Sequence, residues 1–181
     1  MAPLYTGAGD DGTTGLLGEG RLPKHHPLFE ALGALDEASA ALGLARNSCQ
    51  APQSAQRLLV VQRDLYTLMA ELAAAPEHAP QFRKLDLPRL AWLESETDAI
   101  AAQVPLPKEF ILPGDSQAGA ALDLARTIVR RAERRIAGLL DQGMVSNPVS
   151  LPYLNRLSSF LFALELLETK QTGTTLTLAK E

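Results

Sequence analysis

Apolar residues recur at spacings of three and four along most of the chain, the period of a helix that buries one face. Four such stretches span residues 27–46, 53–75, 116–141 and 150–169. Between the second and the third, Asp86 offers an N-cap to a further apolar stripe that runs from Leu90 to Val104. Prolines and mostly short connections separate the stretches, which favours antiparallel neighbours. The pattern therefore predicts an all-α protein, a five-helix up-and-down bundle.

The two ends of the chain lack this period. The segment from Tyr5 to Gly15 holds four glycines and almost no apolar residue, so we expect neither a helix nor a buried strand there. Composition alone favours a disordered leader, and the alternative is a phosphate-binding loop. The threonine-rich end is weakly patterned. We therefore expect a Gly-rich N-terminal loop over 1–26, a helical domain over 27–169 and a loose tail over 170–181.

Composition narrows the class of protein further. Of the 181 residues, 46% are hydrophobic but only 5% are aromatic, which suits helices better than a β-sandwich. The net charge of −4 argues against a nucleic-acid partner, and no apolar run is long enough to span a membrane. Cys49 is the only cysteine, so a disulfide or multi-thiolate metal site within the chain is excluded. The N-terminus lacks the pattern of a secretory signal, and we expect a cytoplasmic protein.

The fourth predicted helix carries a concentrated positive charge. Residues 126–135 sum to +4, with Glu133 as the single acid among five arginines: Arg126, Arg130, Arg131, Arg134 and Arg135. Arg126, Arg130 and Glu133 fall within about 60° of one another on the helix. Guanidinium groups so placed suit a polyphosphate or carboxylate ligand. The alternative, which composition alone favours, is a solvated basic face held by salt bridges.

Two further segments offer polar groups to a ligand. Backbone amides and threonine hydroxyls of the Gly-rich segment suit phosphate oxygens, and Lys24 follows ten residues after Thr14. The segment is not a Walker loop, because no Gly-Lys-Ser/Thr closes it. In the fifth helix, Asn155 is a poor helix former, so either a specific hydrogen bond or plain exposure explains it. We assign no residue as the ligand of a resident metal.

Taken together, five segments in this order resemble the PduO-type ATP:cob(I)alamin adenosyltransferases. The resemblance covers the chain from Tyr5 to about Leu167. The segments are Thr6-Gly7-Ala8-Gly9-Asp10-Asp11-Gly12-Thr13-Thr14 with the following Lys24, Gly33-Ala34-Leu35-Asp36-Glu37, Phe110-Ile111-Leu112-Pro113-Gly114, Ala125-Arg126-Thr127 with Arg130 to Arg135, and Tyr153-Leu154-Asn155-Arg156-Leu157-Ser158.

This resemblance implies a ferritin-like adenosyltransferase bundle that assembles as a homotrimer with active sites between subunits. It implies two substrates, ATP with Mg²⁺ and a cobalamin or related corrinoid. The 5′-deoxyadenosyl group of ATP would pass to the cobalt of cob(I)alamin, and triphosphate would be released. A flavin-dependent reductase and an adenosylcobalamin-dependent enzyme are the further partners that such a reaction suggests.

The resemblance also implies roles for individual residues. Nucleotide binding falls to the leader, the fourth helix and the fifth helix, through Thr6, Gly9, Asp10, Thr14, Gly15, Lys24, Arg130, Arg131, Glu133, Arg134 and Asn155. The catalytic set is Phe110, Asp36, Arg126 and Arg130. Phe110 would lie under the corrin ring and displace the lower axial ligand. Asp36 and Arg126 would pair across the subunit boundary and position the corrinoid.

The sequence departs from the family pattern at several positions. Gly7 and Ala8 stand where the family usually has a basic residue and a threonine. Ala38 and Ser39 replace a common leucine and asparagine, and Ser159 replaces a common aspartate. A non-catalytic corrinoid or nucleotide carrier on the same bundle is therefore the alternative function. A purely structural oligomer would have no need of the Gly-rich leader.

Overall fold

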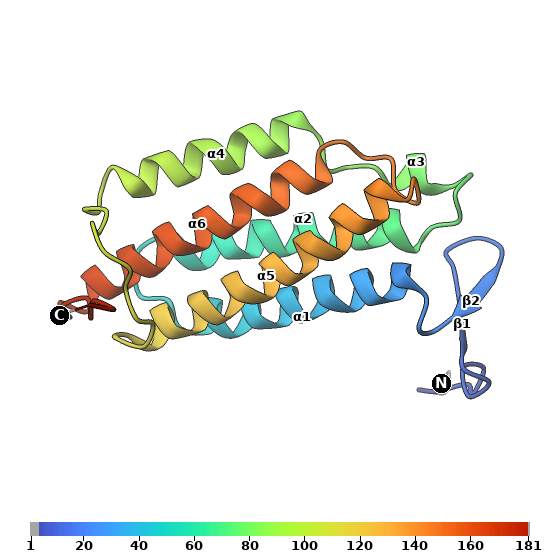
Figure 1. Ribbon diagram of the computed structural model, residues 1–181, viewed down its shortest axis with the longest axis horizontal. Helices are drawn as coiled ribbons and strands as arrows, with labels where there is room; N and C mark the ends of the chain where they lie inside the picture. Colours follow the sequence, from blue (N-terminus) through green and yellow to red (C-terminus); the bar gives the residue numbers. More distant parts are fainter. Residues whose placement is uncertain (1–3, 181) are drawn as a thin grey trace.

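Five long helices lie side by side in a computed structural model that describes residues 4–180 (Figure 1). They are α1 (Pro27–Ser48), α2 (Ser54–Ala73), α4 (Leu87–Ala101), α5 (Gln117–Asp141) and α6 (Ser150–Gln171), with a single-turn α3 (Ala79–Phe82) between α2 and α4. Successive long helices run in opposite directions in Figure 1. The predicted five-helix up-and-down bundle is confirmed, with helix ends within a few residues of those expected.

The helix starts follow from local capping chemistry. Asp86 Oδ1 accepts a hydrogen bond from the Arg89 amide at 3.1 Å, so Asp86 is the N-cap of α4 as predicted. Asp115 and Ser116 directly precede α5, and both are residue types that favour the N-cap position. Ser116 is the cap, because its Oγ accepts from the Gly119 amide at 3.0 Å.

The core lies where α1, α2, α5 and α6 meet, and α4 covers α6. It consists mainly of leucine and alanine, with Tyr153 and Phe160 as its largest fully buried side chains. The Tyr153 hydroxyl donates to Asp64 at 2.6 Å, and Asp64 is also bound by the Arg89 guanidinium at 2.7 Å. Buried polar groups are thus paired across α2, α4 and α6. No helix within residues 4–180 is long and apolar enough to cross a membrane.

The leader differs from the expected loop, since it contains a β-hairpin. Strand β1 (Thr13–Gly15) pairs antiparallel with β2 (Arg21–Pro23), with Thr14 opposite Leu22. Gly18 and Gly20 have φ of +109° and +104°, which lets the chain reverse between the strands. Three-residue strands give no alternating pattern for a sequence-based prediction to detect. Both strands are half-buried at most, so the expectation of no buried strand stands.

The C-terminal segment pairs with the loop between α4 and α5. Ile111 and Leu178 form an isolated antiparallel bridge, flanked by hydrogen bonds from Leu112 N to Thr177 O and from Ala179 N to Phe110 O, at 2.8 and 2.7 Å. The segment that we expected to be a loose tail thus contacts the Phe110 loop as far as Ala179. Both lie at the opposite end of the bundle from the hairpin in Figure 1.

Candidate active site

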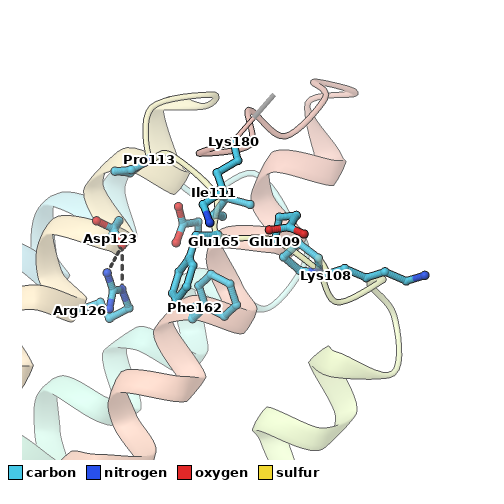
Figure 2. A pocket seen from close by; sticks show the side chains of 11 residues that line it. Lys108, Glu109, Ile111, Pro113, Asp123, Arg126, Phe162, Glu165 and Lys180 are labelled. Atoms are coloured by element: carbon cyan, nitrogen blue, oxygen red, sulfur yellow. Dashed lines mark hydrogen bonds and ion pairs between the residues drawn. The ribbon is translucent and has the colours of Figure 1, made fainter.

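Two cavities lie along the groove between α5 and α6. The first, which we call the Phe110 cavity, has a volume of about 530 Å³ (Figure 2). Its walls come from the 107–113 loop, the first half of α5, the second half of α6 and the C-terminal segment. The lining residues are Pro107, Lys108, Glu109, Phe110, Ile111, Pro113, Asp123, Arg126, Phe162, Glu165 and Lys180.

Phe110 is presented on a loop that is held at both ends. Its side chain is 87% exposed, although a phenyl ring would gain free energy by burial. The backbone oxygen of Phe110 accepts the Ala179 amide, and Pro107 and Pro113 restrict the loop on either side. The ring is therefore not core filler, and it is available to contact a bound molecule.

Arg126 forms an ion pair inside the chain. Its Nη2 and Nε each lie 2.7 Å from Asp123 Oδ1, one turn earlier on α5 (Figure 2). Asp36 is exposed on α1 and does not line this cavity. It forms no ion pair with any residue from 4 to 180. One chain therefore does not bring Asp36 and Arg126 together, and their pairing stays a prediction about a neighbouring subunit.

Glu165 is a buried acid in the wall of the Phe110 cavity. Its side chain is 3% exposed, and its Oε2 has no hydrogen-bond partner within the described residues. Burial, and then the negative charges of Asp123 and Asp115, raise the pKa of Glu165 to about 7 against the opposing effect of Arg126. Much of the population therefore carries a neutral carboxyl at neutral pH.

The second cavity, the Asn155 cavity, has a volume of about 480 Å³ and lies further along the same groove. It is lined by Arg130, Glu133, Arg134, Ala137, Leu151, Pro152, Asn155 and Arg156. The Asn155 amide donates to Glu133 Oε1 at 2.9 Å, and Arg156 Nη1 donates to Asn155 Oδ1 at 2.8 Å. This accounts for an asparagine within a helix. The structure thus brings together Arg130, Glu133, Arg134 and Asn155 as a set.

The remaining arginines of α5 point to another face. Arg131 forms an ion pair with Glu37, and Arg135 pairs with Glu30 at 3.2 Å, both across to α1. For Arg131 and Arg135, the structure therefore supports the alternative interpretation of a solvated basic face held by salt bridges. Arg130 and Arg134 instead form no ion pair with any residue from 4 to 180, and their charges are available in the Asn155 cavity.

The leader folds on itself rather than onto this groove. The Thr6 hydroxyl accepts from the Ala8 amide at 3.3 Å, and Asp10 N donates to Gly7 O. Lys24 Nζ lies only 3.0 Å from where a Cβ on Gly9 would be, so the glycine lets the lysine approach this turn. Thr14 and Gly15 belong to β1.

The leader is tied to the end of α2 instead. Leu17 N donates to Ala73 O at 2.7 Å, and Ala75 N donates to Leu17 O at 2.9 Å, at the end of α2. No hydrogen bond between described residues joins the leader to α5 or α6. The predicted leader residues and Asn155 are therefore not brought together within one chain.

Some residues that line the groove were not singled out from the sequence. They are Asp123, Arg156, Phe162, Glu165 and Lys180. Glu165 carried a usable signal, because it follows the apolar Leu161 by about one helical turn, at a position where an acid is rarely buried. The others lie at positions where a charged or aromatic side chain is ordinary for a helix or a chain end.

Comparison with known proteins decides the family. The family model described as cobalamin adenosyltransferase matches residues 4–168. The chain belongs to this family. The resemblance drawn from the sequence is thereby confirmed.

The relatives of the chain include proteins of different length. The corrinoid adenosyltransferase PduO of Citrobacter freundii is 43% identical over 162 residues, which are 89% of this chain and 48% of the relative. The corrinoid adenosyltransferase of Bacillus subtilis strain 168 is 39% identical over 164 residues, with 88% and 83% covered. The chain spans about half the length of the PduO relatives from Citrobacter freundii and Salmonella typhimurium.

Solved structures of this family share the fold. A phenylalanine-to-alanine variant of the PduO-type ATP:corrinoid adenosyltransferase from Lactobacillus reuteri, complexed with cobalamin and ATP, matches with a TM-score of 0.89 at 31% identity. The match covers 99% of this chain and 100% of that one. An arginine-to-lysine variant from the same organism, complexed with ATP, has a TM-score of 0.84 at 31% identity, with 98% and 100% covered. These matches support the five-helix adenosyltransferase bundle.

Proposed function

We propose that this protein is an ATP:corrinoid adenosyltransferase. The electron pair of cobalt in cob(I)alamin attacks C5′ of ATP, a cobalt–carbon bond forms, the C5′–O bond breaks, and triphosphate leaves with that bond's electrons. The observation that carries the proposal is the pair of cavities on one α5–α6 groove. Arg126 in one cavity and Arg130 in the other are one helical turn apart, about 6 Å along the axis. Two substrates held there would be adjacent.

The Asn155 cavity is our proposed nucleotide end of the groove. It holds three guanidinium groups and the single acid Glu133; Arg156 is paired with Glu94 at 3.0 Å, and the charges of Arg130 and Arg134 suit a polyphosphate. Arg130 and Arg134 are available to stabilise the negative charge that develops on the leaving triphosphate. Asn155 and Glu133, fixed by their mutual hydrogen bond, would orient the nucleoside.

The Phe110 cavity is our proposed corrinoid end. An exposed phenyl ring on a restrained loop can take the place of the lower axial ligand beneath the corrin ring and exclude water from that face. Arg126 lies in the same cavity, where an acid from a neighbouring subunit can compete with Asp123 for its guanidinium.

The proposed site is completed by a second copy of the chain in a homotrimer. Within one chain the leader lies against the end of α2, with no hydrogen bond to α5 or α6 among the described residues. A neighbouring chain could supply Thr6, Gly9, Asp10, Thr14, Gly15 and Lys24 to the Asn155 cavity, and Asp36 to Arg126. Arg131, paired with Glu37 in one chain, would have to exchange partners to reach the nucleotide.

The same proposal implies where the enzyme acts and which other enzymes supply its substrate and use its product. The enzyme would act in the cytoplasm, where ATP is supplied. The reaction consumes cob(I)alamin, so a reductase, which we propose to be flavin-dependent, must deliver the electron. An adenosylcobalamin-dependent enzyme would then receive the product.

One assay tests the activity. The purified protein is incubated anaerobically with ATP, Mg²⁺ and chemically reduced cobalamin, while the cobalt–alkyl absorbance and triphosphate release are followed together. We expect both products in equal amounts. Arg130→Ala should slow the reaction strongly, whereas Arg135→Ala, on the same helix but paired with Glu30 outside the groove, should not. Binding of both substrates without turnover would instead indicate the non-catalytic carrier.

A further inference from the structure

Glu165 is the least explained polar group in the groove. It is 3% exposed, and its Oε2 has no hydrogen-bond partner among residues 4–180. Leaving such an oxygen unpaired destabilises the folded state, so an orphaned buried carboxyl calls for a functional explanation. Figure 2 shows the Glu165 carboxyl in the cavity wall, between Asp123 and Ile111.

The neighbours of Glu165 do not supply that partner. The guanidinium of Arg126 is engaged by Asp123. Lys108 points away from the cavity in Figure 2, whereas Lys180 extends toward Glu165 but forms no hydrogen bond with its Oε2. The titratable groups that line the cavity with Glu165 are Asp123 and Arg126 from α5, Lys108 and Glu109 from the preceding loop, and Lys180 from the C-terminal segment, and Asp115 is near enough to raise its pKa. Helix α4 contributes no titratable side chain from the described residues to this cavity.

The packing holds the carboxyl in this place. A Cβ on Gly119 would lie 3.5 Å from Glu165 Cγ and only 2.7 Å from Ser116 Oγ. Glycine at 119 therefore lets α5 approach α6 where the Glu165 stem crosses between them. The acid cannot swing far from the cavity wall, because its stem is enclosed while its carboxyl meets the cavity.

We propose that Glu165 is a positioning residue for the corrinoid, and that its carboxyl pairs with a primary carboxamide on the rim of the corrin ring. This inference rests on the proposed function. A neutral carboxylic acid and a primary amide are complementary: the acid O–H donates to the amide oxygen, and the amide N–H donates to the acid carbonyl. Both oxygens of Glu165 are then satisfied. Corrin rings carry such acetamide and propionamide groups around their edge.

The proposed pairing requires the protonated form of Glu165, so corrinoid binding should depend on pH. An ionised Glu165 cannot donate, and it would face Asp123 as a second anion. With a pKa of about 7, and only the neutral form pairing, the corrinoid dissociation constant should rise about 30-fold between pH 6 and pH 8.5. Glu165→Gln has no carboxyl to titrate and still offers both a donor and an acceptor, so its affinity should not change over this range.

The test titrates cob(II)alamin into the ATP-loaded protein at pH 6 and pH 8.5. We expect the pH effect in the wild-type protein and its loss in Glu165→Gln, with ATP affinity unchanged. Glu165→Leu should bind about tenfold more weakly than wild type at pH 6, through one lost hydrogen-bonded pair. Glu168→Gln is the matched control, because Glu168 is buried on the same helix but binds the Gln50 and Ala51 amides outside the cavity. It should keep the wild-type pH effect.

A second probe identifies the group that Glu165 contacts. Cobinamide retains the carboxamides, whereas heptamethyl cobyrinate carries esters that lack N–H donors. The wild-type preference for cobinamide should fall about tenfold in Glu165→Leu. Parallel pH profiles for wild type and Glu165→Gln would overturn the inference and assign Glu165 a purely structural role. If the wild-type protein neither binds cob(II)alamin nor forms the cobalt–alkyl product, the proposed function itself fails.

Discussion

Replacing Phe110 by alanine separates a structural role from a catalytic one. Full burial of a phenylalanine side chain is worth about 1.5–3 kcal/mol, and Phe110 is 87% exposed. The truncation should therefore cost about 0.2–0.4 kcal/mol, which corresponds to less than about 2 °C in Tm for a chain of this length. Turnover with cob(II)alamin and a reductant should nevertheless fall by about a hundredfold or more, because the ring no longer holds the lower face of the corrin.

Phe160→Ala is the matched control. Phe160 is 0% exposed in the core, so the same truncation should cost about 3–5 kcal/mol and roughly 6–20 °C in Tm. One melting curve and one activity measurement on each variant suffice, with ATP affinity as a check that the nucleotide end is intact. A large loss of Tm in Phe110→Ala, alongside near-normal specific activity of its folded fraction, would reject the role beneath the corrin.

Further predictions follow from the buried network, the orphaned acid and the C-terminal contact. Asp64→Ala should cost about 1–3 kcal/mol in chemical denaturation, since it leaves the buried Tyr153 hydroxyl and the partly exposed Arg89 guanidinium without their partner, whereas Tyr153→Phe should cost about 1 kcal/mol. The folded-state pKa of Glu165 exceeds its ordinary value of 4.5, so the folded protein binds the proton more tightly and wild-type stability falls as pH rises from about 4.5 to 7. Glu165→Gln should remove this loss of about 3 kcal/mol. Hydrogen bonds from Thr177 lower the pKa of Asp115, so acidification through that lowered pKa, or Asp115→Ala, should speed amide exchange at residues 177–179. An unchanged denaturation midpoint in Asp64→Ala would contradict the first interpretation, and an unchanged pH dependence of stability in Glu165→Gln would contradict the second. Unchanged amide exchange at residues 177–179 in Asp115→Ala would contradict the third.

The bundle could be predicted because the sequence signals of its helices are local. Leucine and alanine at helical spacing, proline stops and the Asp86 cap are all short-range signals. The choice of Ser116 over Asp115 as a cap was not local, since Asp115 is taken by Thr177, which lies 62 positions away in the chain. The leader hairpin depends on two positive-φ glycines and so left no periodic trace.

The arginines of α5 show which part of the candidate site the sequence alone cannot predict. Five arginines on one helix look alike in the sequence, and only the fold shows that Arg131 and Arg135 face acids of α1. Their partners are about 100 residues away, and helical spacing carries no information about which helix packs alongside. The family resemblance selected Arg130, Arg131 and Arg134, of which the structure leaves Arg130 and Arg134 available beside Asn155 and pairs Arg131 with Glu37.

The two ends of the groove differ in charge in a way that suits their proposed substrates. In the Asn155 cavity, Glu94 neutralises Arg156, and Arg130 and Arg134 stand against the single acid Glu133, which leaves an excess of one positive charge that favours a polyphosphate. In the Phe110 cavity, Arg126 is already neutralised by Asp123, and the proton on Glu165 removes a further anion from the wall. A large amide-rimmed ring can then enter without an unpaired anion being desolvated beneath it, since burying such a charge costs far more than burying a neutral acid. The raised pKa of Glu165 thus keeps this acid uncharged in about half of the molecules at pH 7 and in most of them at lower pH, while the guanidinium groups one turn away remain charged for the triphosphate.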